Sequence, residues 1–119
     1  MRMVKAIILI SALFALLLTV TGCTPKQPEA ASVITFENGT YTPKNTSIKL
    51  GQTVTFVNKS NTDMWPASNI HPTHGIYPEF DPKKAVGPGK SWSFTFTKAG
   101  IWKFHDHLNP EITGTITVH

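Results

Sequence analysis

Four of the five histidines form two closely spaced pairs, and imidazole is a ligand that copper and zinc ions favour. In the first pair, His71 and His74 are separated by two residues, one of them proline, so both can converge on one ion from a stiff loop. In the second pair, one residue separates His105 from His107 at the end of an alternating segment. As residues of a β-strand, they would point to the same face. The spacing predicts a site of three or four imidazoles if the two pairs meet in space.

Three acidic residues lie close enough to these histidines in the sequence to support such a site. Asp106, inside the second pair, has two open interpretations: it ligates a hard ion, or it accepts hydrogen bonds from Asn109 and nearby backbone. Glu79 and Asp81 would add an oxygen ligand or hold an imidazole in place from behind. His119 ends the sequence and is not expected to take part.

The composition argues against several other classes of protein. Eleven basic and seven acidic residues give a net charge of +4, and nine lysines face the seven acids once Arg2 and Lys5 are set aside. The lysines are scattered and form no basic stripe, so we expect no nucleic-acid binding. Nine prolines and eight glycines interrupt the chain too often for a long helical bundle. No Ser-His-Asp order, phosphate-binding loop or close carboxylate pair points to hydrolytic chemistry.

The amino terminus predicts export. A basic stretch at 1–5 precedes an uncharged apolar run at 6–20, which is short for a membrane span and typical of a secretory signal peptide. The run ends in Val20-Thr21-Gly22-Cys23, which resembles the lipobox of bacterial lipoproteins. That resemblance implies that Cys23 is lipidated and tethers the protein to the extracytoplasmic side of a membrane. An uncleaved anchor and a plain signal peptide remain as alternatives.

The chain therefore divides into a signal peptide at 1–22, a lipidated cysteine with its tether at 23–31, and a folded domain at 32–119. About ninety residues suffice for a small all-β sandwich. Alternation of apolar and polar residues predicts strands at 32–36, 47–50, 53–57, 91–96, 101–107 and 115–118. The proline-rich interval 60–90 breaks this rhythm, and we expect it to pack down as a functional loop through Trp65, Ile76, Tyr77 and Phe80.

The carboxyl-terminal third resembles the cupredoxins, the superfamily of plastocyanin and amicyanin. Residues 91–118 match an aromatic strand, a Gly turn, a strand that ends at the site, a short loop and a Thr-Gly-Thr-Ile closure, and residues 50–58 are similar to the family's early strand pair. The resemblance implies a single Greek-key β-sandwich, in which the loop with His71 and His74 lies near the end of the sandwich where the strand with His105 and His107 ends. It does not carry over a blue-copper site, which needs a cysteine thiolate. The positions that match the family's ligands hold other residues, namely Asp106, Asn109, Ile112 and Ala67.

A second resemblance fits the histidines that are present. The stretch Gly100-Ile-Trp-Lys-Phe-His-Asp-His107 is similar to the His-x-His strand motif of the cupredoxin domains in multicopper oxidases. In those enzymes such pairs bind coppers of a cluster shared between two domains, whereas this chain has one domain. The resemblance favours copper as the metal. The lack of soft sulfur ligands favours Cu(II), with zinc as the other candidate.

Together these features predict an exported, lipid-anchored cupredoxin-like protein that binds one transition-metal ion through His74, His105 and His107, assisted by His71 or Asp106. We expect a non-blue site for metal handling at the cell envelope, with a redox or metal-delivery protein as partner. Two alternatives stay open. One is an electron-transfer or copper-dependent redox protein, and the other is a metal-free interaction module whose site has decayed. The sequence leaves enzymatic activity undecided and does not predict an oligomeric state.

Overall fold

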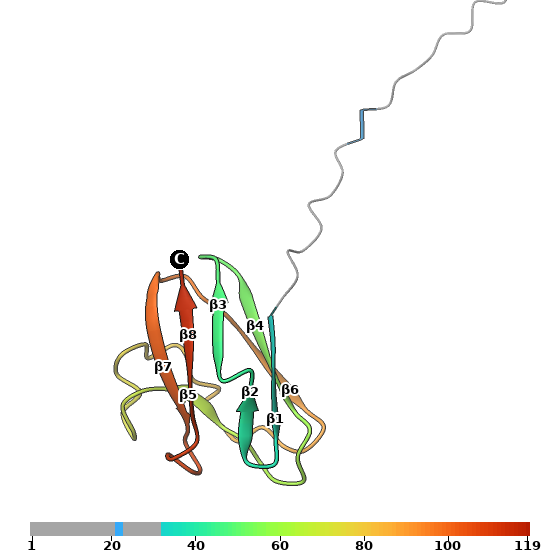
Figure 1. Cartoon of the computed structure of the whole chain (residues 1–119), viewed down its shortest axis with the longest axis vertical. Coiled ribbons are helices and arrows are strands. Elements are labelled where there is room, and N and C mark those ends of the chain that lie inside the picture. The colour runs from blue at the N-terminus through green and yellow to red at the C-terminus, as the bar shows by residue number, and fades with distance from the viewer. Residues whose placement is uncertain (1–20, 23–31) are drawn as a thin grey trace, which may run out of the picture.

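Two four-stranded β-sheets make up the folded part of the chain (Figure 1). The structure, a computed structural model, describes residues 21–22 and 32–119. Its strands are β1 Ser32–Glu37, β2 Thr40–Thr42, β3 Asn45–Ile48, β4 Thr53–Asn58, β5 Pro66–Ser68, β6 Ser91–Thr95, β7 Gly100–Asp106 and β8 Thr113–Val118. The expected signal peptide, apart from residues 21–22, and the expected tether with Cys23 lie outside the described residues. Within the described part, no helix is long and apolar enough to cross a membrane.

The two sheets enclose one hydrophobic core, which follows from the alternation along their strands. One sheet has the order β2-β1-β4-β6 and the other β3-β8-β7-β5, with β1–β4 and β3–β8 as parallel pairs. In β4, Val54, Phe56 and Asn58 are buried while the residues that alternate with them are half-buried. Phe56 of the first sheet meets Phe104 of the second edge-on, with ring centroids 5.6 Å apart. The predicted all-β sandwich is confirmed.

Four strands depart from the sequence expectation, among them β8, which begins two residues before the strand predicted at 115–118. β2 and β5 were not predicted, because three residues each are too few to show an alternation. The strand predicted at 47–50 is β3, which begins and ends two residues earlier. Its register is set by parallel pairing with β8, where Ile48 lies opposite Val118. Leu50 therefore falls in the following turn and is 53% exposed.

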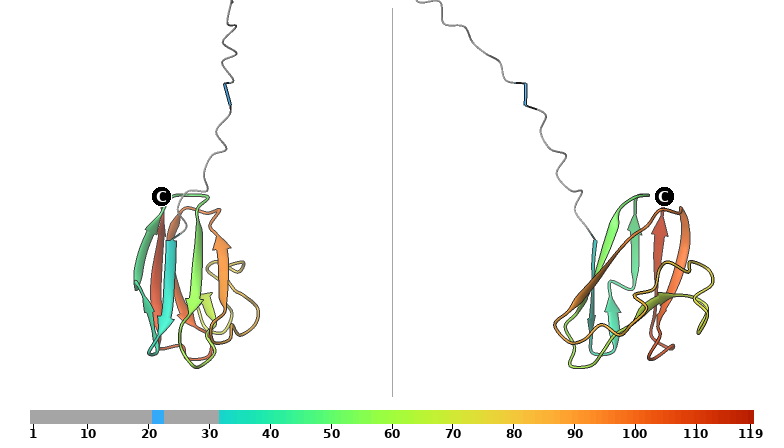
Figure 2. Two further views of the ribbon diagram at one scale, coloured as in Figure 1. Left: turned by 90° about the vertical axis from the view of Figure 1, so that its right-hand side faces the viewer. Right: turned by 180° about the vertical axis from the view of Figure 1, so that it is seen from behind.

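The proline-rich interval 60–90 packs onto the sandwich, as its apolar residues predicted. Tyr77 and Phe80 are buried and Trp65 is half-buried, although Ile76 is 39% exposed. Within this interval β5 pairs with β7 in antiparallel fashion. The segment that follows β5 lies beside β7 where the molecule is seen from behind (Figure 2, right), in keeping with the pairing of β5 with β7. The first histidine pair is thereby brought next to the strand that carries the second.

Candidate metal site

The end of β7 directs His105 to the outer face of its sheet. Side chains alternate along a strand, so the buried Phe104 points into the core while Ile101 and Lys103 are exposed on the opposite face. His105 belongs to that opposite face, yet it is only 2% exposed. The loop that follows β5 covers this face at the end of β7. His107, one residue beyond the strand, is fixed by its N–H, which donates to the Trp65 carbonyl at 2.8 Å.

Hydrogen bonds hold the covering loop in place. The Asn69 N–H donates to the Lys103 carbonyl of β7 at 3.0 Å. The hydroxyl of buried Ser68 reaches the His74 carbonyl at 2.8 Å. His74 has a φ of +55°, a left-handed conformation that is uncommon outside glycine, and its N–H donates to the Ile70 carbonyl at 2.7 Å. This tight turn leaves the His74 side chain buried against the sandwich.

Strand and loop together bring four imidazoles to one point. One ligand atom from each lies within 4.8 Å of the other three, and the residues are His71, His74, His105 and His107. His71 Nδ1 is 3.3 Å from His105 Nε2, and His74 Nε2 is 3.1 Å from His107 Nδ1. Two nitrogens that bind one ion tetrahedrally at about 2.0 Å are about 3.3 Å apart. These separations are therefore those of ligands that share a single ion.

The two buried imidazoles are oriented from behind by oxygen acceptors. His74 Nδ1 is 2.7 Å from Asp81 Oδ2, and His105 Nδ1 is 2.9 Å from Asn69 Oδ1. Because a carboxylate and an amide oxygen only accept, each Nδ1 carries the proton and donates. In the neutral ring, each Nε2 then presents its lone pair to the cluster, as a metal ligand must. Sequence reasoning considered Asp81 for this role but missed Asn69, since no spacing links it to a residue 36 positions away.

Burial favours the neutral form of two of the imidazoles, those of His105 and His107. Burial, and then the three neighbouring imidazoles, lower the pKa of His105 to about 4. Burial, and then the imidazoles of His74 and His71, also lower the pKa of His107. Burial alone would raise the pKa of Asp81, but hydrogen bonds from His74, the Lys83 N–H and the Trp65 indole hold it at about 2. The site thus combines two imidazoles whose pKa is lowered with an ionised carboxylate behind a third, His74.

Access to the cluster is uneven. His74 and His105 are 4% and 2% exposed, His107 is half-buried and His71 is exposed. The ring of His107 packs against the Trp65 ring, with centroids 4.5 Å apart. The cluster is therefore closed toward the sandwich and open at His71.

Asp106, the fifth ligand expected from the sequence, is not part of this group. Its Oδ2 accepts from the Tyr41 hydroxyl at 2.5 Å and from the Trp65 N–H at 2.9 Å. Its Oδ1 accepts from the Leu108 and Asn109 N–H groups at 3.0 and 3.1 Å. The geometry fits the second of the two interpretations, in which Asp106 bonds Asn109 and nearby backbone. Four donors already satisfy this carboxylate, which ties the end of β7 to its surroundings.

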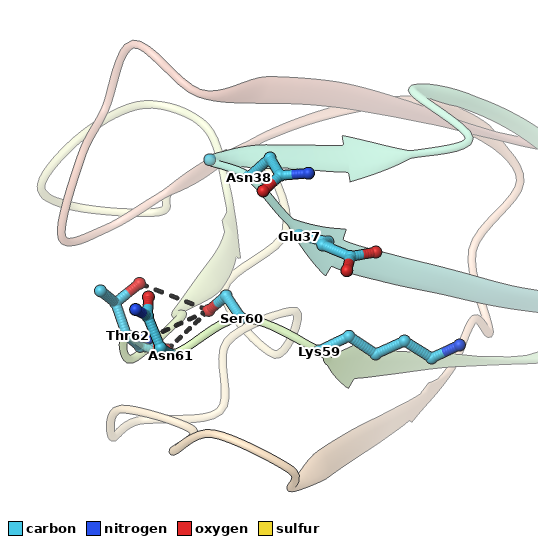
Figure 3. A pocket seen from close by; sticks show the side chains of 7 residues that line it. Glu37, Asn38, Lys59, Ser60, Asn61 and Thr62 are labelled. Carbon is cyan, nitrogen blue, oxygen red and sulfur yellow. Dashed lines mark hydrogen bonds between the residues drawn. The ribbon is translucent and has the colours of Figure 1, made fainter.

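The remaining candidates lie away from the four imidazoles. Glu79 is exposed and its carboxylate is 3.4 Å from Lys98 Nζ. His119 is at the carboxyl terminus, where its ring nitrogen is 3.4 Å from the Ser47 hydroxyl. A separate depression of about 420 Å³ lies beside the β1–β2 turn and the segment after β4 (Figure 3). Among the residues described along its wall, Glu37 is the one carboxylate and there is no imidazole, so its donor set does not resemble a metal site.

Comparison with known proteins relates this β-sandwich to one family of domains and to several solved structures. The family model described as "Cupredoxin-like domain" matches residues 8–118. A reduced amicyanin mutant is similar with a TM-score of 0.67 and 22% identity, over 79% of this chain and 87% of that one. A Cu(I) amicyanin mutant has a TM-score of 0.66 and 23% identity over the same shares. A purple cupredoxin from Nitrosopumilus maritimus has a TM-score of 0.65 and 23% identity, over 74% of this chain and 99% of that one.

None of the curated proteins is a significant match to this sequence. At these identities the solved structures establish the fold, while the family model covers nearly the whole sequence. The four imidazoles gather at the end of β7, and Asp106 does not belong to their group. This chain belongs to the cupredoxin-like domain family.

Proposed function

We propose that this protein binds one copper ion, as Cu(II), at the site formed by His71, His74, His105 and His107. The observation that carries the proposal is the convergence of four ring nitrogens within 4.8 Å. Acceptors behind two of the rings support it further, because they direct the Nε2 lone pairs into the cluster. A histidine placed for packing alone would need neither arrangement.

The donor set favours divalent copper over other ions. Imidazole nitrogens suit copper and zinc, and Cu²⁺ binds a given nitrogen site more tightly than Zn²⁺ does. The cupredoxin-like fold and a Cu(I) form among the amicyanin structures add weight to copper. Blue copper requires a thiolate, and Asp106 occupies the position that the family pattern assigns to it. We therefore propose a non-blue site, with zinc as the alternative ion.

The proposed role is metal handling at the cell envelope, by capture, buffering or delivery. The amino-terminal pattern with Cys23 supports an exported, lipid-anchored protein. The exposed edge of the site at His71 supports exchange of the ion with a partner protein. An ion held by three further imidazoles would remain bound while this ligand is replaced.

The test is titration of Cu(II) into the metal-free protein, followed by electron paramagnetic resonance and visible absorption. A Cys23→Ser background removes the sole thiol as a competing ligand. We expect one tightly bound ion with nitrogen hyperfine structure and without the intense thiolate band found at roughly 600 nm in blue sites. His105→Ala with His107→Ala should abolish stoichiometric binding, whereas the matched control His119→Ala should not. A folded protein that binds no ion would contradict the proposal and favour an interaction module.

A redox role is the second candidate. The packing of the Trp65 ring on His107 favours it, because an aromatic side chain beside a ligand gives electrons a short route to the surface. Reversible cycling between Cu(II) and Cu(I) at a defined potential would support this candidate. Loss of the ion on reduction would exclude it and leave metal handling.

A further inference from the structure

We propose that Asp81 determines the charge of the ion that the site prefers, favouring doubly charged over singly charged metals. The proposal rests on the proposed function, because it concerns the same four imidazoles. Asp81 contacts no ion itself. It acts through the ring of His74, which lies between its carboxylate and the cluster.

The contacts of Asp81 fix a negative charge behind His74. Its Oδ2 accepts from His74 Nδ1 at 2.7 Å, and its Oδ1 accepts from the Trp65 indole N–H and the Lys83 N–H, both at 2.8 Å. All three neighbours are donors, as a carboxylate requires. The Asp81 side chain is 7% exposed, so little solvent screens its charge from the imidazole.

Lys83 compensates the negative charge of Asp81 only weakly. Lys83 Nζ is 3.4 Å from Asp81 Oδ2, but this side chain is 70% exposed and such surface pairs contribute little. All other lysines that the structure describes are exposed as well. A buried carboxylate is costly unless a positive charge compensates it. A cation on His74 Nε2 supplies that charge, and its attraction to Asp81 grows in proportion to the charge of the ion.

Asn69 shows that a neutral acceptor is enough to orient an imidazole, so the negative charge of Asp81 is not needed for orientation. It holds His105 by the same kind of contact at 2.9 Å, with a neutral amide oxygen. Both acceptors fix the tautomer of the ring behind which they lie. Only Asp81 adds charge. The effect of charge can therefore be separated from the effect of orientation by exchanging the two side-chain types.

The experiment measures Zn(II) and Ag(I) affinities by competition, as probes of a divalent and a monovalent ion that do not change oxidation state under the assay. The variants are Asp81→Asn, Asn69→Asp and the double variant. In D81N we expect Zn(II) affinity to fall roughly 10- to 100-fold and Ag(I) affinity to fall less, so that their ratio drops about tenfold. N69D should raise the ratio above that of the wild type. The double variant should return it toward the wild-type value, because the charge is then restored behind the other ring.

The copper potential gives a second readout. A tenfold loss of Cu(II) affinity relative to Cu(I) raises a one-electron potential by about 59 mV, so the potential of D81N should rise and that of N69D should fall. The matched control is Glu79→Gln. Glu79 lies two residues before Asp81 and is 62% exposed, so the same charge change there should leave the ratio unchanged.

Equal losses of Zn(II) and Ag(I) affinity in D81N would overturn the inference, since they would show that Asp81 only orients His74. An unchanged ratio in N69D would also overturn it, and this arm remains decisive if D81N does not fold. Either result leaves the proposed function intact as long as the wild type binds one Cu(II). A wild type that binds neither copper nor zinc would instead refute the proposed function, and the inference with it.

Discussion

The end of β7 and the loop after β5 each supply two imidazoles, but they do so by different physical means. His105 and His107 gain their common direction from the alternation of an extended chain. His71 and His74 follow no repeating geometry, and their loop is held by single contacts such as the Ser68 hydroxyl on the His74 carbonyl. A regular element therefore fixes directions locally, whereas a loop needs partners that are distant in the sequence.

The two buried carboxylates repeat this contrast. Asp106 accepts two backbone N–H groups from the turn after β7 and one from Trp65, so it shapes the chain around the strand end. Asp81 accepts from an imidazole and orients a ligand. Trp65 touches both, through its backbone N–H and its indole. Loss of Asp106 should therefore affect folding first, and loss of Asp81 should affect the site first.

Asp106→Ala is the substitution with the largest expected effect on this contrast. It would leave the buried Tyr41 hydroxyl and three N–H groups, those of Trp65, Leu108 and Asn109, without their acceptor. We expect the free energy of unfolding to fall by about 3–4 kcal/mol. Urea denaturation of the metal-free protein measures this. Burial by itself raises the pKa of Tyr41, so in the variant its hydroxyl keeps the unpartnered proton at neutral pH.

The control for Asp106→Ala is Asp106→Asn, which retains one acceptor and should be less damaging. A loss below about 1 kcal/mol in the Ala variant would show that water replaces the carboxylate. The end of β7 would then be held only by its backbone hydrogen bonds to neighbouring strands. This result would contradict the contrast in which Asp106 supports folding and Asp81 supports the site.

Ser68→Ala tests the loop in the same way and should have a smaller effect. Ser68 is fully buried and its hydroxyl is 2.8 Å from the carbonyls of both His74 and Tyr77. We expect a loss of about 1–2 kcal/mol in the free energy of unfolding, together with weaker metal binding, because the turn that carries His74 loosens. Chemical denaturation and Cu(II) competition measure the two effects.

Ser93→Ala is the matched control for Ser68→Ala. The Ser93 hydroxyl also makes a hydrogen bond, but its partner is the Thr55 hydroxyl at 2.8 Å on an exposed face. We expect a change of at most about 0.5 kcal/mol there, and none in metal binding. If both serine variants behaved alike, the loop would not depend on its buried hydroxyl.

The sequence predicted the regular parts of the molecule more closely than the irregular ones. The strands expected at 53–57 and 91–96 agree with β4 and β6 to within one residue, because their alternation is long enough to be distinct. β5 has three residues and begins with proline, so no local pattern marks it. Its existence depends on pairing with β7, which lies far along the chain.

The same limit applies to the candidate site. A common direction for His105 and His107 could be predicted, because it is a property of adjacent residues in an extended chain. That His71 and His74 could meet them was expected from the fold that the chain resembles, and the structure brings them together. The role of Asn69 behind His105 and the four donors around Asp106 depend on three-dimensional packing, so no spacing in the sequence indicates them.

The pH dependence of stability should show two separate pH ranges, or windows. One belongs to His105 in β7 and the other to Asp81 in the loop after β5. The pKa of His105 falls from 6.5 to about 4 on folding, so the unfolded chain binds a proton first. Its contribution is complete above pH 6.5 and is lost as the pH falls toward 4. The pKa of Asp81 falls from 3.8 to about 2, so its contribution is complete above 3.8 and is lost as the pH falls toward 2.

Urea denaturation of the metal-free protein at pH 7, 4.5 and 2.5 measures both windows. His105→Gln should flatten the upper window and Asp81→Asn the lower one. We expect the pH-dependent change in the free energy of unfolding to be smaller than the loss in Ser68→Ala. Local opening of the loop lets His105 take up a proton without global unfolding. If His105→Gln left the upper window unchanged, that window would have to arise from the other imidazoles.

Lys83→Gln should have the smallest effect, although Lys83 Nζ is 3.4 Å from Asp81. The side chain is 70% exposed, while the Lys83 N–H, which is 2.8 Å from Asp81 Oδ1, remains in the variant. We expect stability to change by at most about 0.5 kcal/mol and Cu(II) affinity by at most about twofold, with any difference disappearing at high salt. Isothermal titration at two salt concentrations measures this. If Lys83→Gln shifted affinity as far as Asp81→Asn does, the charge behind His74 would be set by a solvent-exposed ion pair. The exposed ion pair would then determine how His74 binds the ion, and the hydrogen bonds of Asp81 would serve only to orient the His74 ring.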